Sequence, residues 1–313
     1  MKRTAVSGKK GILSKHKISG YIFCYSLMAY SIILFLVFYV YTHLDTFVMA
    51  FQNVKVDGSR SFAGLENFAT IFNDLKDGGL ILTSVKNSLI MFVLCFSISM
   101  PLYIIFAYLI FKKVFGHKVV TTLMVTPAVV SGFVFALIFK NFASSPLQQI
   151  MRSAGLEHFP NLIDDVKYAY GTGIFYIIWA SFYTNLIIYS NAMRNIDPAL
   201  IESAKIDGMS TMFQELRFIV LPLIYPTLTT FIVTGFAGIF SNQGPLVLFY
   251  ADGAPAEVYN VGYYMFKEVA YKSYSPVGFP LIAAMGLILT VIVAPLTMLL
   301  NHLMDKYSPM RDM

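Results

Sequence analysis

Polar and aromatic side chains gather in one otherwise apolar stretch of the sequence, residues 168–193. Ser181 and Asn185 are four residues apart and share one face of a helix, while Trp179 and Tyr183 form a neighbouring stripe. Aromatic faces combined with hydroxyl and amide groups are suited to a neutral solute that is rich in hydroxyls. A structural interpretation remains open, because Ser and Tyr in apolar helices often bond their own helix or pack between helices.

Further polar side chains follow in a later apolar stretch, residues 218–251. Thr234 shares a helical face with Thr227 and Thr230, and Asn242 lies beyond them. These groups either extend the same solute site or bond their own helix. The five histidines of the sequence show no metal-ligand spacing. We therefore expect a binding site, and neither a metal site nor a catalytic site.

A second kind of site is predicted in the segment 194–217, which has the signals of two short helices. Asp197 is a good N-cap and Pro198 suits the first helical position. They predict a helix over 198–207, which ends at Gly208.

Ser210 or Thr211 can begin the second helix, where Gln214 is placed to complete a capping box. One face of this helix is apolar and consists of Met209, Phe213 and Leu216. Such a face must be buried, either against the chain's own helices or against a cytoplasmic partner.

The elements that hold these residues are located by the absence of charge. The chain has 313 residues, 57% of them hydrophobic and only 13% charged, with a mean hydropathy of +0.66. Soluble domains have about 25% charged residues, and disordered chains have few apolar ones, so both classes are excluded. Six long stretches contain no Asp, Glu, Lys or Arg, and a spanning helix needs about 20 apolar residues. We predict an all-α polytopic membrane protein with six transmembrane helices at about 18–42, 87–111, 119–139, 169–193, 218–240 and 277–303.

Lys and Arg concentrate in one set of flanks, namely the tail 1–17, the loops 112–118 and 194–217, and the C-terminus. This bias predicts that both termini and these two loops are cytoplasmic. The net charge of +6 is then a feature of membrane topology, and the basic tail is expected to lie against anionic lipid and not against nucleic acid. We expect one permease-like domain over 18–308 and a short C-terminal tail, 309–313.

The segment 194–217 closely resembles the coupling motif of bacterial ABC-importer permeases, E-A-A-x3-G-x9-I-x-L-P. Here it reads Glu202-Ser203-Ala204 and then Gly208, followed by Ile219-Val220-Leu221-Pro222. Ser replaces the first Ala of the motif, and ten residues instead of nine separate the Gly from the Ile.

The likeness extends over most of the chain. Segments 64–68, 87–89, 127–132 and 195–198 resemble the corresponding parts of carbohydrate permeases, in particular the maltose-type first subunit. The resemblance implies the ABC type I importer transmembrane-domain architecture in the bacterial cytoplasmic membrane. It also implies a heterodimer with a second homologous permease subunit, an ATP-binding cassette ATPase dimer and an extracytoplasmic sugar-binding protein.

The resemblance assigns roles to the coupling residues. Glu202 would be the polar anchor in a cleft of the ATPase, Ala204 the close-contact position and Gly208 the bend. The apolar face that would be buried there consists of Met209, Phe213 and Leu216. The sequence contains no G-x-x-x-x-G-K-[ST] phosphate loop, so ATP and Mg²⁺ are expected on the partner ATPase and no cofactor on this chain.

By the same resemblance, the cargo is a sugar or an oligosaccharide. Trp179 precedes Glu202 by the spacing of a sugar-stacking Trp in maltose-type permeases, and Asn242 matches a sugar-contacting Asn there. The predicted substrate contacts are Trp179, Ser181, Tyr183, Asn185, Thr234 and Asn242. Another solute such as glycerol phosphate or a polyol remains an alternative. An ion-coupled secondary transporter is disfavoured, because such transporters commonly use carboxylates within the membrane and the predicted spans contain none.

Overall fold

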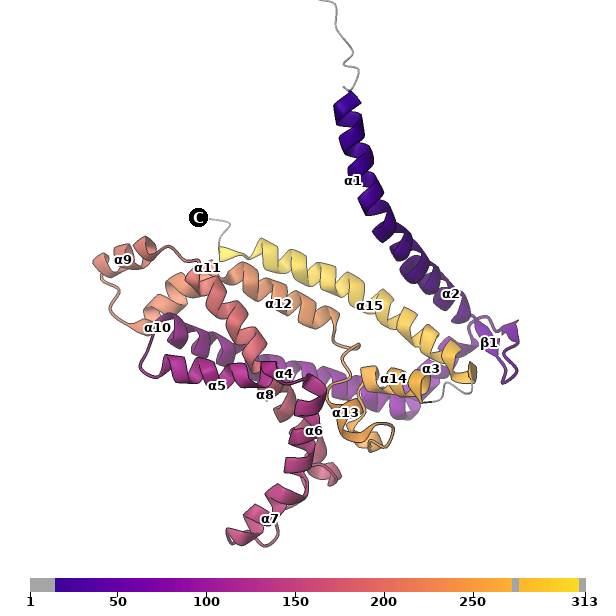
Figure 1. The fold of residues 1–313 in the computed structure, drawn as a ribbon. Helices are drawn as coiled ribbons and strands as arrows, with labels where there is room; N and C mark the ends of the chain where they lie inside the picture. Colours follow the sequence, from indigo (N-terminus) through magenta and orange to yellow (C-terminus); the bar gives the residue numbers. More distant parts are fainter. Residues whose placement is uncertain (1–14, 272–275, 310–313) are drawn as a thin grey trace, which may run out of the picture.

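The computed structural model describes residues 15–271 and 276–309, and nearly all of its regular structure is helical (Figure 1). The exception is a small antiparallel hairpin of β1 (Gln52–Val54) and β2 (Arg60–Phe62). The predicted all-α class is therefore confirmed.

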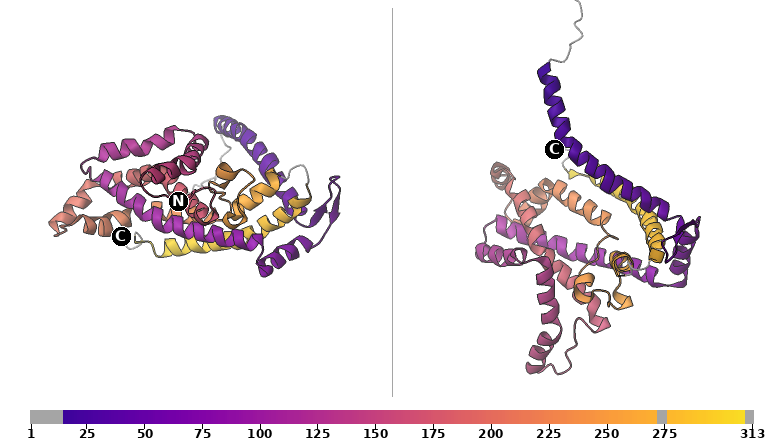
Figure 2. Two further views of the ribbon diagram at one scale, coloured as in Figure 1. Left: turned by 90° about the horizontal axis from the view of Figure 1, so that it is seen from below. Right: turned by 45° about the vertical axis from the view of Figure 1, so that its right-hand side comes forward.

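The first helical arm extends away from the rest of the chain (Figures 1 and 2). It is continuous through α1 (Lys15–Leu34), a π-helical stretch (Phe35–Tyr41) and α2 (Thr42–Met49). No residue in the most apolar part of the arm is buried, which suits a helix surrounded by lipid or by another subunit. The arm includes the predicted span 18–42 and continues to Met49.

The segment after the hairpin is fixed to it by an amide side chain. Asn67, in α3 (Glu66–Asp77), donates hydrogen bonds to the carbonyl oxygens of Ala50 and Gln52, at 3.0 and 2.9 Å. Gly64 supplies the left-handed backbone, φ 57°, that turns the chain into α3. The segment 64–68 thus connects the first arm to the bundle.

The longest helix is α4 (Leu80–Phe111), which packs along α8 (Val166–Arg194). Helix α4 begins before the predicted residue 87, because Asp74 accepts a hydrogen bond from the backbone N–H of Ile81 at 2.9 Å and so extends the first turn. Near the predicted start, Asn87 donates to the carbonyl oxygens of Glu257 and Tyr259 at 2.7 and 2.8 Å.

The predicted span 119–139 is not one continuous helix. The structure has two short helices there, α5 (His117–Val129) and α6 (Gly132–Ala143), separated by extended backbone at Val130 and Ser131. β-branched residues followed by Ser-Gly are poor helix formers, so uniform hydropathy concealed the break. Helix α7 (Ser145–Ser153) follows α6.

The next two predicted spans are bent. Helix α8 bends by 41° between Phe182 and Thr184. The other bend, 67°, separates Met212–Leu223 from α12 (Tyr225–Ala237), where Pro226 begins the new helix. The first part of that pair comprises α10 (Met212–Glu215), a π-helical stretch (Leu216–Val220) and α11 (Leu221–Leu223).

The chain ends with α13 (Leu246–Tyr250), a 3-10 turn (Ala256–Val258), α14 (Val261–Ala270), a 3-10 turn (Pro276–Gly278) and α15 (Phe279–Lys306). Within the described residues, three helices are long and apolar enough to cross a membrane, and there are up to five spans if each bent pair is one span. The structure thus supports a polytopic membrane protein without reaching the predicted count of six.

Candidate functional site

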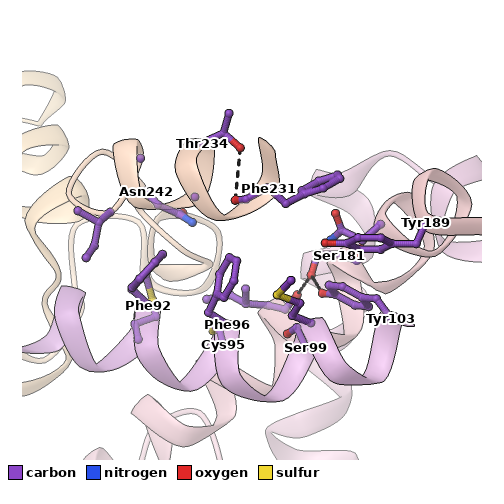
Figure 3. A pocket seen from close by; sticks show the side chains of 17 residues that line it. Phe92, Cys95, Phe96, Ser99, Tyr103, Ser181, Tyr189, Phe231, Thr234 and Asn242 are labelled. Atoms are coloured by element: carbon purple, nitrogen blue, oxygen red, sulfur yellow. Dashed lines mark hydrogen bonds between the residues drawn. The ribbon is translucent and has the colours of Figure 1, made fainter. Parts of the chain in front are cut away.

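A cavity of about 350 Å³ lies between α4, α8 and α12, and we call it the central pocket (Figure 3). Its lining comprises 17 residues, all uncharged. Those with aromatic rings or polar groups are Phe92, Phe96, Ser99, Tyr103, Ser181, Asn185, Tyr189, Phe231, Thr234 and Asn242. The pocket can offer ring faces, hydroxyls and amides to a solute, which suits a neutral, hydroxyl-rich molecule.

The predicted pair on α8 lines this pocket. The Ser181 hydroxyl donates to the carbonyl oxygen of Ile177 at 2.6 Å and lies 2.7 Å from the Tyr103 hydroxyl. Since a serine has one hydroxyl proton, Tyr103 is the donor in the second contact. Asn185 donates to the carbonyl oxygen of Ser181 at 3.0 Å, which leaves its amide oxygen available to a ligand.

Two predicted residues beyond α8 also line the central pocket. The Thr234 hydroxyl donates to the carbonyl oxygen of Thr230 at 2.6 Å, so it bonds its own helix, and Figure 3 shows it pointing away from α4. The amide oxygen of Asn242 accepts from the backbone N–H of Gly244 at 2.8 Å and shapes the turn after α12. Of the two, Asn242 has the amide directed toward the pocket in Figure 3.

The structure places Trp179 outside the central pocket. Its ring packs against Phe135 and Phe139 of α6, with centroids 4.6 and 5.7 Å apart, and the residue is 40% exposed. Trp179 and Ser181 are two positions apart, which places their side chains about 200° apart around the helix. The side chain of Tyr183 lies outside the part of the chain that the structure describes. Contact of either residue with a sugar stays a prediction.

The aromatic side of the pocket comes from α4, which the sequence analysis did not select. The rings of Phe92 and Phe96 lie next to each other along this helix, tilted by 32° at a centroid distance of 5.4 Å, and Tyr103 follows two turns later. Gly235 of α12 faces them, and a Cβ there would lie 3.2 Å from the Phe96 ring. The sequence feature that could have identified this wall is a pair of phenylalanines four residues apart in a charge-free stretch. The same pattern is also typical of ordinary core packing.

The first coupling helix agrees with the prediction to within one residue. Helix α9 (Pro198–Ile206) is capped by Asp197, which accepts from the backbone N–H of Ala199 at 2.9 Å. The chain then turns at Gly208 with φ 97°, a left-handed conformation that favours glycine. On α9, Glu202 is exposed and Ala204 half-buried.

The second coupling helix begins with the predicted capping box, in which Thr211 and Gln214 exchange hydrogen bonds. Its apolar face differs from the prediction. Phe213 is 67% exposed, but Leu216 packs against the chain's own bundle, and the half-buried Met209 precedes the helix. The exposed apolar side chains of the two coupling helices are Leu200, Ile206, Met212 and Phe213, so both helices present apolar surface to solvent.

Comparison with known proteins identifies the family. Residues 115–310, more than half of the chain, match the model of the family described as binding-protein-dependent transport system inner membrane component. The matched region includes α5 to α15 and therefore the coupling segment and two walls of the central pocket.

Several curated relatives are named as transport system permease proteins. The arabinooligosaccharides transport system permease protein AraP of Halalkalibacterium halodurans is 26% identical over 86% of this chain and 83% of its own length. AraP of Bacillus subtilis is 24% identical over 96% of this chain and 93% of its own length. The sn-glycerol-3-phosphate transport system permease protein UgpA of Escherichia coli is 27% identical over 74% of this chain and 78% of its own length.

The fold is that of a solved importer subunit. A chain of a bacterial ABC transporter involved in the import of the acidic polysaccharide alginate superposes with a TM-score of 0.78, at 22% identity, over 94% of this chain and 98% of that one. A second structure of a bacterial alginate ABC transporter, in complex with an alginate pentasaccharide-bound periplasmic protein, gives a TM-score of 0.77 at 21% identity. This chain belongs to the family of binding-protein-dependent transport system inner membrane components.

Proposed function

We propose that the chain is a permease subunit of an ATP-driven ABC importer for a sugar or an oligosaccharide that an extracytoplasmic binding protein delivers. The observation on which this rests is the central pocket, where uncharged aromatic, hydroxyl and amide groups of α4, α8 and α12 converge. Stacking on ring faces and hydrogen bonds to amides are the interactions by which proteins bind neutral sugars. The relatives named for arabinooligosaccharides support the same class of cargo.

The proposed sugar contacts are Phe96 on one wall and Ser181, Asn185 and Asn242 around it. Thr234 and Tyr103 also line the pocket, and Tyr103 acts by holding the Ser181 hydroxyl in place. Trp179 is a second place where a sugar ring could stack, because part of its surface is exposed.

A second candidate cargo is glycerol phosphate, since the relative UgpA is named for sn-glycerol 3-phosphate. A phosphate ester needs cationic or strongly donating partners, and the described lining of the central pocket contains no Lys or Arg. The neutral oligosaccharide is therefore preferred.

In the membrane, we propose six crossings. They are the three long helices, the two bent pairs, and α5 with α6 as one interrupted crossing. An interruption within the bilayer is tolerated where the backbone is covered by protein or lines a cavity. Both termini and the segment 194–217 then lie on the cytoplasmic side, as the distribution of Lys and Arg predicts.

Two further partners are part of the proposal, a second permease subunit and an ATPase dimer. A second homologous permease subunit would complete the translocation path, and an ATPase dimer would hydrolyse ATP with Mg²⁺. The exposed apolar residues Ile206, Met212 and Phe213, with Glu202 beside them on α9, would be covered by that ATPase. The bacterial cytoplasmic membrane is the location that the family description supports.

The test is uptake by proteoliposomes that contain this chain, its partner permease and the ATPase, with the binding protein outside. We expect ATP-dependent uptake of labelled arabinotriose that requires the binding protein, and no uptake of glycerol 3-phosphate. Uptake of glycerol 3-phosphate alone would select the second candidate, and ATP-independent uptake would contradict the importer assignment.

A further inference from the structure

A buried ion pair joins the coupling segment to the helix that lines the central pocket. The ammonium group of Lys112, directly after α4, lies 2.9 Å from each carboxylate oxygen of Glu215, the last residue of α10. The side chain of Glu215 is 4% exposed and that of Lys112 is 21% exposed. The pair lies beside an apolar cluster formed by α4, α8 and the second coupling helix.

A second contact holds the same two elements together one helical turn away. The hydroxyl of Tyr108 in α4 donates to the carbonyl oxygen of Met212, the first residue of α10, at 3.1 Å. Tyr108 and Lys112 are four residues apart and therefore on one face of the helix. Both ends of α10 are thus fixed to the cytoplasmic end of α4.

Helix α4, which carries both contacts to α10, also forms part of the wall of the central pocket. Tyr103, Ser99 and Phe96 of α4 line the central pocket, within about four turns of Lys112. On the coupling side, the exposed Met212 and Phe213 belong to the surface assigned above to the ATPase. A displacement of α10 therefore has a direct mechanical route to the pocket wall.

A buried charged pair is a poor choice if holding two helices together is all that is needed. Packed apolar residues do this as well or better, since the cost of removing two charges from water offsets their attraction. The pair does fix one geometry, because a carboxylate left without its partner in an apolar site is strongly unfavourable. Such a link transmits movement instead of absorbing it.

We propose that the Lys112–Glu215 pair is the joint that passes movement of α10 to α4 and so changes access to the central pocket. The proposal rests on the proposed ATP-driven function. Lys112 and Glu215 are positioning residues in this scheme, and neither contacts the solute.

The experiment measures how accessible the central pocket is to a reagent, so it does not depend on the identity of the sugar. Cys95 lines the central pocket, and Cys24 is the other cysteine of the chain. In the complete reconstituted importer with Cys24→Ser, the rate of Cys95 alkylation by N-ethylmaleimide is measured by mass spectrometry with and without ATP–Mg²⁺. Each rate is normalised to the amount of assembled complex, and the readout is the rate with ATP–Mg²⁺ divided by the rate without it.

The variants are Glu215→Gln, Lys112→Met and the exchanged pair Lys112→Glu with Glu215→Lys. The matched control is Asp45→Asn, which breaks the exposed ion pair, also 2.9 Å long, between Asp45 of α2 and Arg60 of the hairpin. We expect ATP to change the rate about fivefold or more in the unmodified chain and in the control. The two single variants should bring the ratio close to one, and the exchanged pair should restore most of it.

Three results would overturn the proposal. They are an unchanged ratio in Glu215→Gln, a loss that the exchanged pair does not restore, and failure of Glu215→Gln to assemble, which would make the pair a folding element only. Absence of any ATP response in the unmodified chain is a different result, because it would contradict the proposed function itself.

Discussion

The hydroxyl of Tyr103 on α4 lies 2.7 Å from the hydroxyl of Ser181 on α8, at one end of the central pocket. The contact joins two helices that pack along each other, and the two residues are 78 positions apart in the sequence. It also sets the direction of the Ser181 hydroxyl, whose proton goes to the carbonyl oxygen of Ile177. The polar end of the pocket is therefore arranged before any solute arrives.

The first prediction concerns this contact. Tyr103→Phe keeps the ring but leaves the Ser181 oxygen without its donor, which costs about 1–3 kcal/mol in a buried site. We expect a several-fold rise in the KM for arabinotriose uptake with the amount of assembled complex preserved. Tyr176→Phe is the control, since Tyr176 is buried on α8 but not among the pocket residues. Equal KM values for the two variants would show that the contact has no part in binding.

The second prediction uses the close approach of α12 to the aromatic wall. Gly235→Val would place a side chain against Phe96, whose ring is 3.2 Å from the position of a Cβ. Overpacking of this kind costs about 1–3 kcal/mol and here narrows the pocket. Uptake should fall at least tenfold in proteoliposomes, whereas Gly171→Val in α8, where no atom lies within 4 Å of the Cβ, should retain most of it. An active Gly235→Val transporter would contradict the assignment of the pocket.

The third prediction concerns the turn between the coupling helices. Gly208 has φ 97° and no atom within 4 Å of a Cβ, so Gly208→Val acts through backbone strain and not through collision. A left-handed conformation costs a residue with a side chain about 1–2 kcal/mol. We expect sugar uptake per ATP hydrolysed to fall while the chain still inserts into the membrane. Gly58→Val is the control, with φ 82° in the hairpin, and normal uptake by Gly208→Val would disprove the coupling role.

The fourth prediction concerns the side of the bundle that is proposed above to be extracytoplasmic. Asn87→Ala removes the amide that binds the carbonyl oxygens of Glu257 and Tyr259, which leaves both without that donor. We propose that the binding protein docks on the loop before α14. The variant should loosen this loop, so that stimulation of ATP hydrolysis by the binding protein requires a higher concentration of that protein. Asn301→Ala is the control, since Asn301 bonds Asp305 near the C-terminus. If stimulation of ATP hydrolysis depends on the concentration of binding protein in the same way as in the unmodified chain, the loop before α14 has no part in docking that protein.

The fifth prediction distinguishes the two places where a sugar ring can stack. Phe96→Leu and Trp179→Leu each remove one ring and keep an apolar side chain. Loss of an aromatic contact is worth about 0.5–1.5 kcal/mol, which is up to about tenfold in affinity. Measured as the KM for arabinotriose, the larger effect should belong to Phe96→Leu. A larger effect of Trp179→Leu would move the site to the face of α8 that packs on α6.

The local parts of the fold could be predicted because their signals are local. Asp197 with Pro198 determined the start of α9, and Thr211 with Gln214 formed the expected capping box. The pair Ser181 and Asn185 was found from helical spacing alone, and both line the central pocket.

The remaining features depend on contacts between distant segments. Nothing in the spacing of Phe92 and Phe96 reveals that Gly235 brings α12 against them. The break at Val130 and Ser131 is a backbone feature within a charge-free stretch, so the absence of charge could not reveal it. For Leu216, periodicity identified an apolar face and left its cover open, the resemblance assigned it to the ATPase, and the structure packs it against the chain's own bundle.

The most direct test of the account is a structure of the assembled importer with arabinotriose trapped during transport. The account predicts sugar density in the central pocket, with a ring against Phe96 and hydroxyls within hydrogen-bonding distance of Asn185. Density stacked on Trp179 at the α6 side, with the central pocket empty, would contradict it.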